Sequence, residues 1–154
     1  AVLAQVFAPG RLDVLQRYRS ILTTWDAAGP NVRAVTVIIT GNHTHEMIGR
    51  DAVRYCASDG VLADLDRADL PADLCPLISS DWKKTFHWDG TGPMPDAERA
   101  LLRQLVERAH QQHRQIRFWD APDYAAAWAE LRAAGVDWIN TDDLAGLQKF
   151  LLAR

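Results

Sequence analysis

The feature that most constrains this chain is a regular alternation of helical and strand-like segments over its C-terminal part. Residues 96–113 and 123–134 carry apolar side chains at helical spacing, and residues 116–119 and 136–140 are short apolar runs typical of strands. Gly135 follows the second helical segment and predicts its end. Strands that alternate with amphipathic helices of this length predict parallel βαβ units with right-handed crossovers.

The upstream part of the chain carries weaker patterns. Residues 33–40 are β-branched and almost continuously apolar, which predicts a strand that is buried on both faces of a parallel sheet. Residues 2–25 predict a broken or two-part helix, and residues 50–57 predict a short helix. Residues 60–65 and 76–79 are apolar runs that we interpret as further strand candidates.

Composition and charge exclude several classes of function. The net charge is -3, and Lys and Arg are interspersed with Asp and Glu, so the sequence carries no basic surface for nucleic acid. No apolar run approaches the ~20 residues of a membrane span. Cys56 and Cys75 match no zinc-ligand spacing; we interpret them as small buried side chains, with pairing as the alternative in a secreted protein.

The C-terminal segments carry a resemblance to a known family. Residues 113–123 contain a strand-like run that ends in Trp119, and residues 134–142 read Ala-Gly-Val-Asp-Trp-Ile-Asn-Thr-Asp. This pattern resembles the last two βα units of the glycerophosphodiester phosphodiesterase superfamily. The pieces at 37–42, 60–65, 76–82 and 86–90 are similar to a bacterial, often secreted branch of phosphatidylinositol phospholipase C-like proteins.

The resemblance implies an α/β fold whose parallel βα units form part, about the last four strands, of a (β/α)₈ TIM barrel. A complete barrel usually needs about 250 residues, and about 200 at least, whereas this chain has 154. We therefore expect residues 1–154 to be a single incomplete barrel domain that corresponds to the C-terminal half. The family's N-terminal His-x-His-Asn and Glu-x-Asp motifs do not occur in the sequence.

By the same resemblance, the parent protein would hydrolyse a glycerophosphodiester or a phosphoinositide with a histidine acid–base pair and Ca²⁺ or Mg²⁺. Those groups would lie in the N-terminal half. The chain alone is then expected to be inactive, to hold no metal or other cofactor of its own, and to contact a phosphodiester small molecule or a lipid headgroup. A secreted bacterial location is also implied by the resemblance alone.

Barrel enzymes place their active sites at the C-terminal ends of the strands. The substrate-pocket candidates are therefore the residues at the predicted strand ends: Asn42, Ser80, Trp119 and Asn140. Asn42 has the alternative role of a turn residue, and Trp119 that of a core aromatic. We expect Asp142 to cap the last helix rather than to bind a ligand.

Two other polar or aromatic segments were considered as sites. Residues 43–46, with the sequence His-Thr-His-Glu, lack a third ligand at a fixed spacing, so a solvated loop is predicted there rather than a metal site. The long loop at 80–95 contains Trp82, Phe86 and Trp88. These rings form either a lid over a substrate or ordinary packing over the barrel mouth.

Two alternatives belong to other functional classes. A non-catalytic fragment would act through self-association, because a partial barrel leaves an open sheet edge and an apolar flank. A flavodoxin-like sheet would bind a small ligand at the point where its strand order reverses. The sequence contains no glycine-rich phosphate loop that would favour this second alternative.

Overall fold

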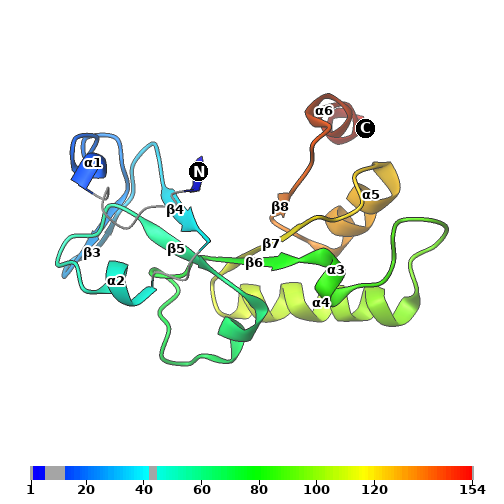
Figure 1. Ribbon diagram of the computed structural model, residues 1–154, viewed down its shortest axis with the longest axis horizontal. Helices are drawn as coiled ribbons and strands as arrows, with labels where there is room; N and C mark the ends of the chain where they lie inside the picture. Colours follow the sequence, from blue (N-terminus) through cyan, green and yellow to red (C-terminus); the bar gives the residue numbers. More distant parts are fainter. Residues whose placement is uncertain (1, 6–12, 42–44, 154) are drawn as a thin grey trace. The chain divides into compact units, whose positions relative to one another are not determined.

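The computed structural model describes residues 2–5, 13–41 and 45–153. The chain divides into two compact units, Ala1–Leu77 and Ile78–Arg154. Both units contain hydrogen-bonded strands alternating with helices, which places the chain in the α/β class (Figure 1). The expectation of one incomplete barrel domain over residues 1–154 stays a prediction.

The first unit is built around three parallel strands. β4 (Val37–Thr40) lies between β1 (Val2–Gln5) and β5 (Ala57–Gly60) and is parallel to both. A two-stranded antiparallel hairpin, β2 (Thr24–Asp26) and β3 (Gly29–Asn31), comes between β1 and β4 in the sequence. The remaining elements are α1 (Asp13–Gln16), α2 (His45–Gly49) and the 3₁₀ helix η1 (Leu62–Asp66).

The strand predicted at residues 33–40 is confirmed over β4. Its Val37, Ile38 and Ile39 are all buried, as the unbroken apolar run indicated. Val37 and Ile39 point into a cluster that includes Leu22 and Ile48. Strand alternation places Ile38 on the opposite face.

Other predictions for the first unit are wrong. Among the described residues of the segment predicted as a helix, 2–5 and 13–25, the α-helix is confined to Asp13–Gln16, and Val2–Gln5 is a strand paired with β4. The helix expected at 50–57 is instead His45–Gly49. For Val2–Gln5, pairing with β4 outweighs a weak local helical preference.

The strand expected at 60–65 is displaced toward the N-terminus, where β5 ends at Gly60. Beyond it, the carboxylate of Asp64 accepts a hydrogen bond from the backbone N–H of Val61 at 2.8 Å. This local bond supports a 3₁₀ turn rather than continued pairing in the sheet.

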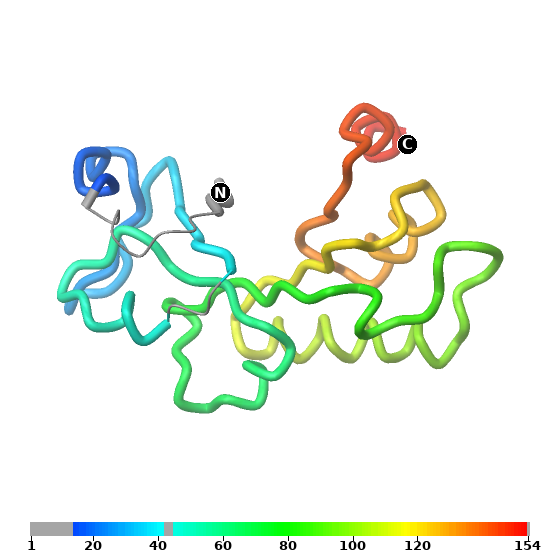
Figure 2. Tube along the Cα trace, viewed as in Figure 1, coloured from blue at the N-terminus to red at the C-terminus, as the bar shows by residue number. Residues whose placement is uncertain are grey.

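The second unit matches the predicted alternation closely. Its elements are β6 (Leu77–Asp81), α3 (Trp82–Thr85), α4 (Asp96–Gln111), β7 (Gln115–Trp119), α5 (Ala125–Ala134), β8 (Trp138–Ile139) and α6 (Leu144–Leu152). β7 and β8 are parallel, and β6 lies beside β7. α4 runs along β7 and also packs against α5 (Figure 2).

Gly135 ends α5 as predicted. Its φ of 82° lies in the left-handed region, and its N–H is directed to the carbonyls of Leu131 and Arg132. This conformation turns the chain sharply from α5 into β8, which follows within three residues.

Strand order separates the barrel from the flavodoxin-like alternative. Within each unit the strands lie in the order of the sequence, β1-β4-β5 in the first and β6-β7-β8 in the second. A doubly wound sheet reverses its order at a switch point, whereas a barrel adds each strand next to the preceding one. The arrangement is therefore that expected for part of a TIM barrel.

The aromatic segment between β6 and α4 is part of the core. The Trp82 and Phe86 rings have centroids 4.2 Å apart, and Phe118 of β7 meets both rings edge-on. Trp82 donates a hydrogen bond from Nε1 to the carbonyl of Trp88 at 2.9 Å, and the carboxylate of Glu98 accepts from the Trp88 N–H at 3.0 Å. Of the two interpretations of this segment, the structure shows packing.

Substitutions on the two faces of β7 test this core directly. Phe118→Ala should destabilise the protein by about 3–5 kcal/mol, because it leaves a cavity among buried rings. Trp119→Ala, one residue along the same strand but on the half-exposed face, should cost about 1 kcal/mol or less. Urea unfolding followed by far-UV circular dichroism measures both. Equal losses for the two variants would contradict the assignment of faces.

Candidate functional site

A cavity of about 390 Å³ opens at the C-terminal ends of β7 and β8. Seven residues from the two strand ends and the loops that follow line it: Trp119, Asp120, Ala121, Asp123, Asn140, Thr141 and Asp142. Two of the four predicted pocket residues, Trp119 and Asn140, therefore lie in one cavity. We call this cavity the strand-end pocket.

Strand geometry explains why these two side chains meet. β7 and β8 are parallel with Arg117 opposite Trp138 and Phe118 opposite Ile139. Continuing this register by one residue sets Trp119 opposite Asn140, on the face that also bears Arg117. The other face of β7 carries Ile116 and Phe118, which are completely buried. The indole of Trp119 is 40% exposed.

Asp123 holds the two loops of the pocket together. Its carboxylate lies in the loop between β7 and α5 and accepts hydrogen bonds from the hydroxyl of Thr141 and from the backbone N–H groups of Asp142 (2.7 Å) and Asp143 (3.2 Å). The indole N–H of Trp128 also donates to it at 3.2 Å. Partial burial alone would raise the pKa of Asp123, but these hydrogen bonds outweigh it and lower the pKa below its ordinary value.

Asp120 stands at the tip of β7 in an unusual conformation. Its φ of 57° lies in the left-handed region, which a residue other than glycine adopts at some cost. Its carboxylate pairs with the ammonium group of Lys83 at 2.8 Å, and this contact raises the pKa of Lys83. The pair joins the loop after β7 to α3. Asp120 and Lys83 also line a second hollow, of about 410 Å³, together with Trp82, Phe86 and Tyr124.

Of the other two predicted pocket residues, Ser80 does not line this cavity. Ser80 lies in β6, but its neighbour Ser79 is the residue that bonds to Arg117, with its Oγ accepting from Nε at 2.8 Å. Strand alternation turns Ser80 to the opposite face from Ser79. Asn42 lies outside the described residues. The roles of all four residues stay predictions.

Sequence reasoning missed Arg117 and Asp123. Arg117 is a charged residue inside a strand that was predicted from its apolar neighbours. The alternation of residues 115–119 is the signal that could have placed Arg117 on the open face of the strand. Asp123 was considered only as the start of a helix. Its actual partners come from residues 141–143, about 20 positions later, so local pattern could not reveal them.

The cap predicted at Asp142 is wrong by one residue. Asp143 is the N-cap of α6, and its carboxylate accepts from the N–H of Gly146 at 2.8 Å. The backbone N–H of Asp142 is instead bonded to Asp123. Asp142 itself lines the strand-end pocket.

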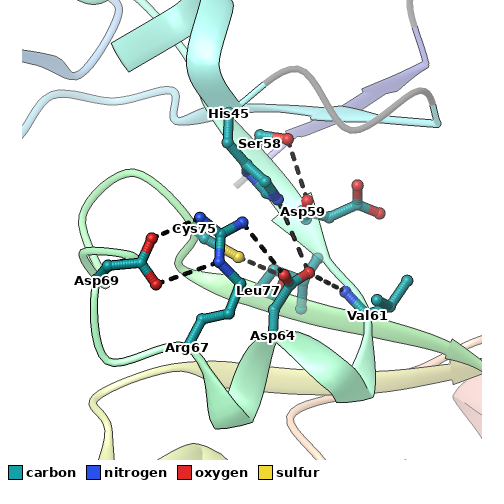
Figure 3. A network of polar contacts seen from close by, with 9 residues as sticks. All are labelled: His45, Ser58, Asp59, Val61, Asp64, Arg67, Asp69, Cys75 and Leu77. Carbon is teal, nitrogen blue, oxygen red and sulfur yellow. Dashed lines mark hydrogen bonds and ion pairs between the residues drawn. The ribbon is translucent and has the colours of Figure 1, made fainter.

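The first unit holds a polar network that the sequence did not predict (Figure 3). His45 was expected in a solvated loop, but it begins α2 and is 6% exposed. Its Nε2 lies 3.8 Å from the Asp64 carboxylate, which is also 3.8 Å from the guanidinium of Arg67. Arg67 in turn binds Asp69, and this contact raises the pKa of Arg67 and lowers that of Asp69. Because the imidazole is buried, the network is a structural link between α2 and η1.

The two cysteines are buried and are not joined in a disulfide. Burial, together with the nearby carboxylate of Asp51, raises the pKa of the Cys56 thiol to about 11. The thiol is therefore protonated at neutral pH and is a poor nucleophile. Cys75 is completely buried, and its Sγ lies 3.9 Å from the carbonyl oxygen of Leu77.

The described residues do not fit a divalent-cation site. Within residues 2–5, 13–41 and 45–153, no group of three or more His, Cys, Asp or Glu side chains is placed to hold a metal ion. The carboxylate of Asp123, which is the best placed in the strand-end pocket, is already engaged by four donors.

The elements that form the strand-end pocket also carry a family signature. Residues 115–145 match the glycerophosphoryl diester phosphodiesterase family. This phosphodiesterase match runs from the first residue of β7 to the start of α6 and includes every residue that lines the pocket. It confirms the resemblance over these residues. No curated protein and no solved structure shows significant similarity to the chain.

In the described ranges, none of the helices has both the length and the apolar character needed to cross a bilayer.

The Asp123 contacts predict a pH-dependent contribution to stability. A carboxylate whose folded pKa is lowered stabilises the fold above its unfolded value near 3.8, and this stability is lost as the pH falls through the folded pKa. Asp123→Asn should cost about 1 kcal/mol at pH 7, allowing for solvent screening, because the amide N–H₂ faces backbone donors. The variant should also lose less stability than the wild type on acidification.

Thermal unfolding from pH 7 to pH 3 tests this expectation. Asp142→Asn is the matched control, because Asp142 reaches Asp123 through its backbone N–H and keeps that bond in the variant. Identical pH profiles for wild type and Asp123→Asn would show that the carboxylate does not link the two loops.

Proposed function

We propose that this chain forms part of a phosphodiesterase-like barrel and orients the alcohol portion of a glycerophosphodiester or phosphoinositide in the strand-end pocket. The observation that carries the proposal is the coincidence of the family match at residues 115–145 with the residues that line this pocket. In TIM barrels, the C-terminal ends of the strands form the active-site face. The pocket lies at those ends of β7 and β8.

The pocket offers suitable chemistry for a polyol. The half-exposed indole of Trp119 gives a flat apolar surface for the C–H face of a glycerol or inositol group. The amide of Asn140 both donates and accepts hydrogen bonds, which suits a hydroxyl group. These groups bind and orient; neither transfers protons readily at neutral pH.

The proposal assigns the chemical step to other parts of the barrel. Hydrolysis of the diester would use a histidine acid–base pair and Ca²⁺ or Mg²⁺ in the parent protein. General acid–base catalysis requires a donor and an acceptor within reach of the scissile bond. Among the described residues that line the pocket, none is a histidine, and His45 is buried in the first unit.

We therefore expect the isolated chain to show no phosphodiesterase activity. It should be assayed with glycerophosphocholine and with a phosphoinositide, in Ca²⁺, in Mg²⁺ and in chelator, beside a complete glycerophosphodiester phosphodiesterase as positive control. Orientation without proton transfer or charge stabilisation should leave turnover at the background rate. Turnover by the chain that disappears on Asn42→Ala would contradict the proposal and locate the catalytic centre within this chain.

A second candidate function, association with another barrel segment or a second copy, is favoured by the surface of α6. Leu144, Leu151 and Leu152 are 74%, 46% and 73% exposed, although the helix packs its Phe150 ring against Trp128 of α5. Exposed leucines on one short helix are an unfavourable surface for a monomer. β8 beside it is only two residues long, so the sheet edge there offers little pairing of its own.

Sedimentation of the chain tests this second candidate. The wild type should associate as its concentration rises through the micromolar range, and the double variant Leu144→Glu/Leu152→Glu should be monomeric at the same concentrations. Val32→Glu is the matched control, because Val32 is 76% exposed but lies beside the β2–β3 hairpin in the other unit. A compact wild-type monomer at high concentration would count against association through α6.

A further inference from the structure

The strand-end pocket presents an electrostatic difficulty for a phosphodiester. Three carboxylates, those of Asp120, Asp123 and Asp142, line it, and the described lining residues include no Lys or Arg. A phosphodiester carries a negative charge, which like charges at short range repel. A pocket that accepts such a ligand therefore requires a positive group close to its floor.

Part of the negative charge of the pocket is already offset. The carboxylate of Asp120 is paired with Lys83 at 2.8 Å. Asp123 accepts hydrogen bonds from one hydroxyl, two backbone N–H groups and one indole N–H. These contacts reduce the repulsion between the carboxylates and a bound phosphodiester. None of them brings a positive group into contact with the ligand.

Arg117 is placed to supply the positive charge. It lies two residues before Trp119 in β7, so both side chains leave the same face of the strand with their Cα atoms about 6.6 Å apart. Arg117 is partly buried, while Gln115 and Trp119, two positions away on the same face of β7, are exposed. Arg117 stands opposite Trp138 of β8. It is the basic residue of β7, and it occupies the layer directly below the one formed by Trp119 and Asn140.

The guanidinium of Arg117 is also held in place. Its Nε donates to the hydroxyl of Ser79 in β6 at 2.8 Å. A hydrogen bond at Nε fixes the plane of the guanidinium and reduces the rotamer freedom that would be lost on binding. The planar fork of an arginine matches two oxygens of a phosphoryl group, which a lysine cannot do.

We propose that Arg117 is the phosphate-recognising residue of the strand-end pocket, binding the phosphoryl oxygens of a polyol phosphate whose carbon skeleton contacts Trp119 and Asn140. The inference rests on the proposed function, which it deepens by dividing the ligand between two layers of the sheet face. The layer of Trp119 and Asn140 selects the polyol. The layer of Arg117 and Ser79 selects the negatively charged phosphoryl group.

A purely structural role makes a different prediction. If Arg117 only braces β7 against β6, its replacement should lower the stability of the second unit and weaken charged and neutral ligands alike. If Arg117 recognises phosphate, its replacement should weaken only the charged ligand. The comparison of two ligands that differ by one phosphate group therefore separates the two roles.

The experiment is a titration of the chain with myo-inositol 1-phosphate and with myo-inositol, followed by NMR of the Trp119 indole N–H. Trp119→Phe assigns that signal. The wild type should bind the phosphate more tightly than the neutral polyol. Arg117→Gln should weaken the affinity for the phosphate by about 10-fold or more, as expected for loss of charged hydrogen bonds. It should leave the affinity for the neutral polyol unchanged. Arg132→Gln, an exposed arginine on α5, should change neither affinity.

Two further variants keep the test decisive if Arg117→Gln does not fold. Arg117→Lys keeps the charge but loses the fork, and it should reduce the preference for phosphate several-fold. Ser79→Ala removes the Nε contact and should give a smaller reduction in the same preference. Well-dispersed spectra of both variants establish that they are folded.

The outcomes distinguish this inference from the proposed function. An unchanged preference for phosphate in Arg117→Gln or Arg117→Lys, with Trp119→Ala weakening both ligands, would overturn the role of Arg117 and leave the pocket as the polyol site. Equal weakening of both ligands by the Arg117 variants would make the residue a brace. Failure of the wild type to bind either ligand would overturn the proposed function and this inference together.

Discussion

The alternation of β7 is the constraint on which the second unit depends. Ile116 and Phe118 bury one face of this strand, while Arg117 and Trp119 occupy the other. Because side chains alternate strictly along a strand, the packing that buries the phenylalanine also fixes the direction of the tryptophan. The core therefore fixes one wall of the pocket: no separate interaction is needed to place Trp119 on the face opposite Phe118.

The loops of the pocket depend on a different kind of contact. They contain few apolar residues, and the carboxylate of Asp123 takes the place of a small core by gathering donors from Thr141, Asp142 and Asp143. A single carboxylate that accepts from two backbone N–H groups and one hydroxyl is an efficient way to order a loop, because one charged group fixes three consecutive residues. The site thus combines a rigid strand with loops held by one charged group.

The sequence predicted the second unit well and the first unit poorly, for a physical reason. α4 and α5 have strong helical spacing, and Gly135 supplies an unambiguous stop, so local information was sufficient there. Val2–Gln5 is a strand because it pairs with β4, more than thirty residues away, and no local pattern carries that information. The same limit applies to the site. That Trp119 and Asn140 share a cavity could be expected from the sequence because both stand at strand ends, whereas Asp123 acts through partners that only the fold brings near.

Charge gives the two layers of the sheet face different tasks. The rim carries Asp120, Asp123 and Asp142, and a rim of this sign disfavours anions in general. A basic residue one layer deeper would favour an anion only when the rest of the ligand fills the pocket above it, because only then does the phosphoryl group reach the guanidinium. Selectivity for a polyol phosphate over free phosphate would then follow from the depth of Arg117 rather than from additional contacts. The acidic rim, which at first opposes the binding of a phosphodiester, would in this way contribute to the choice among anions.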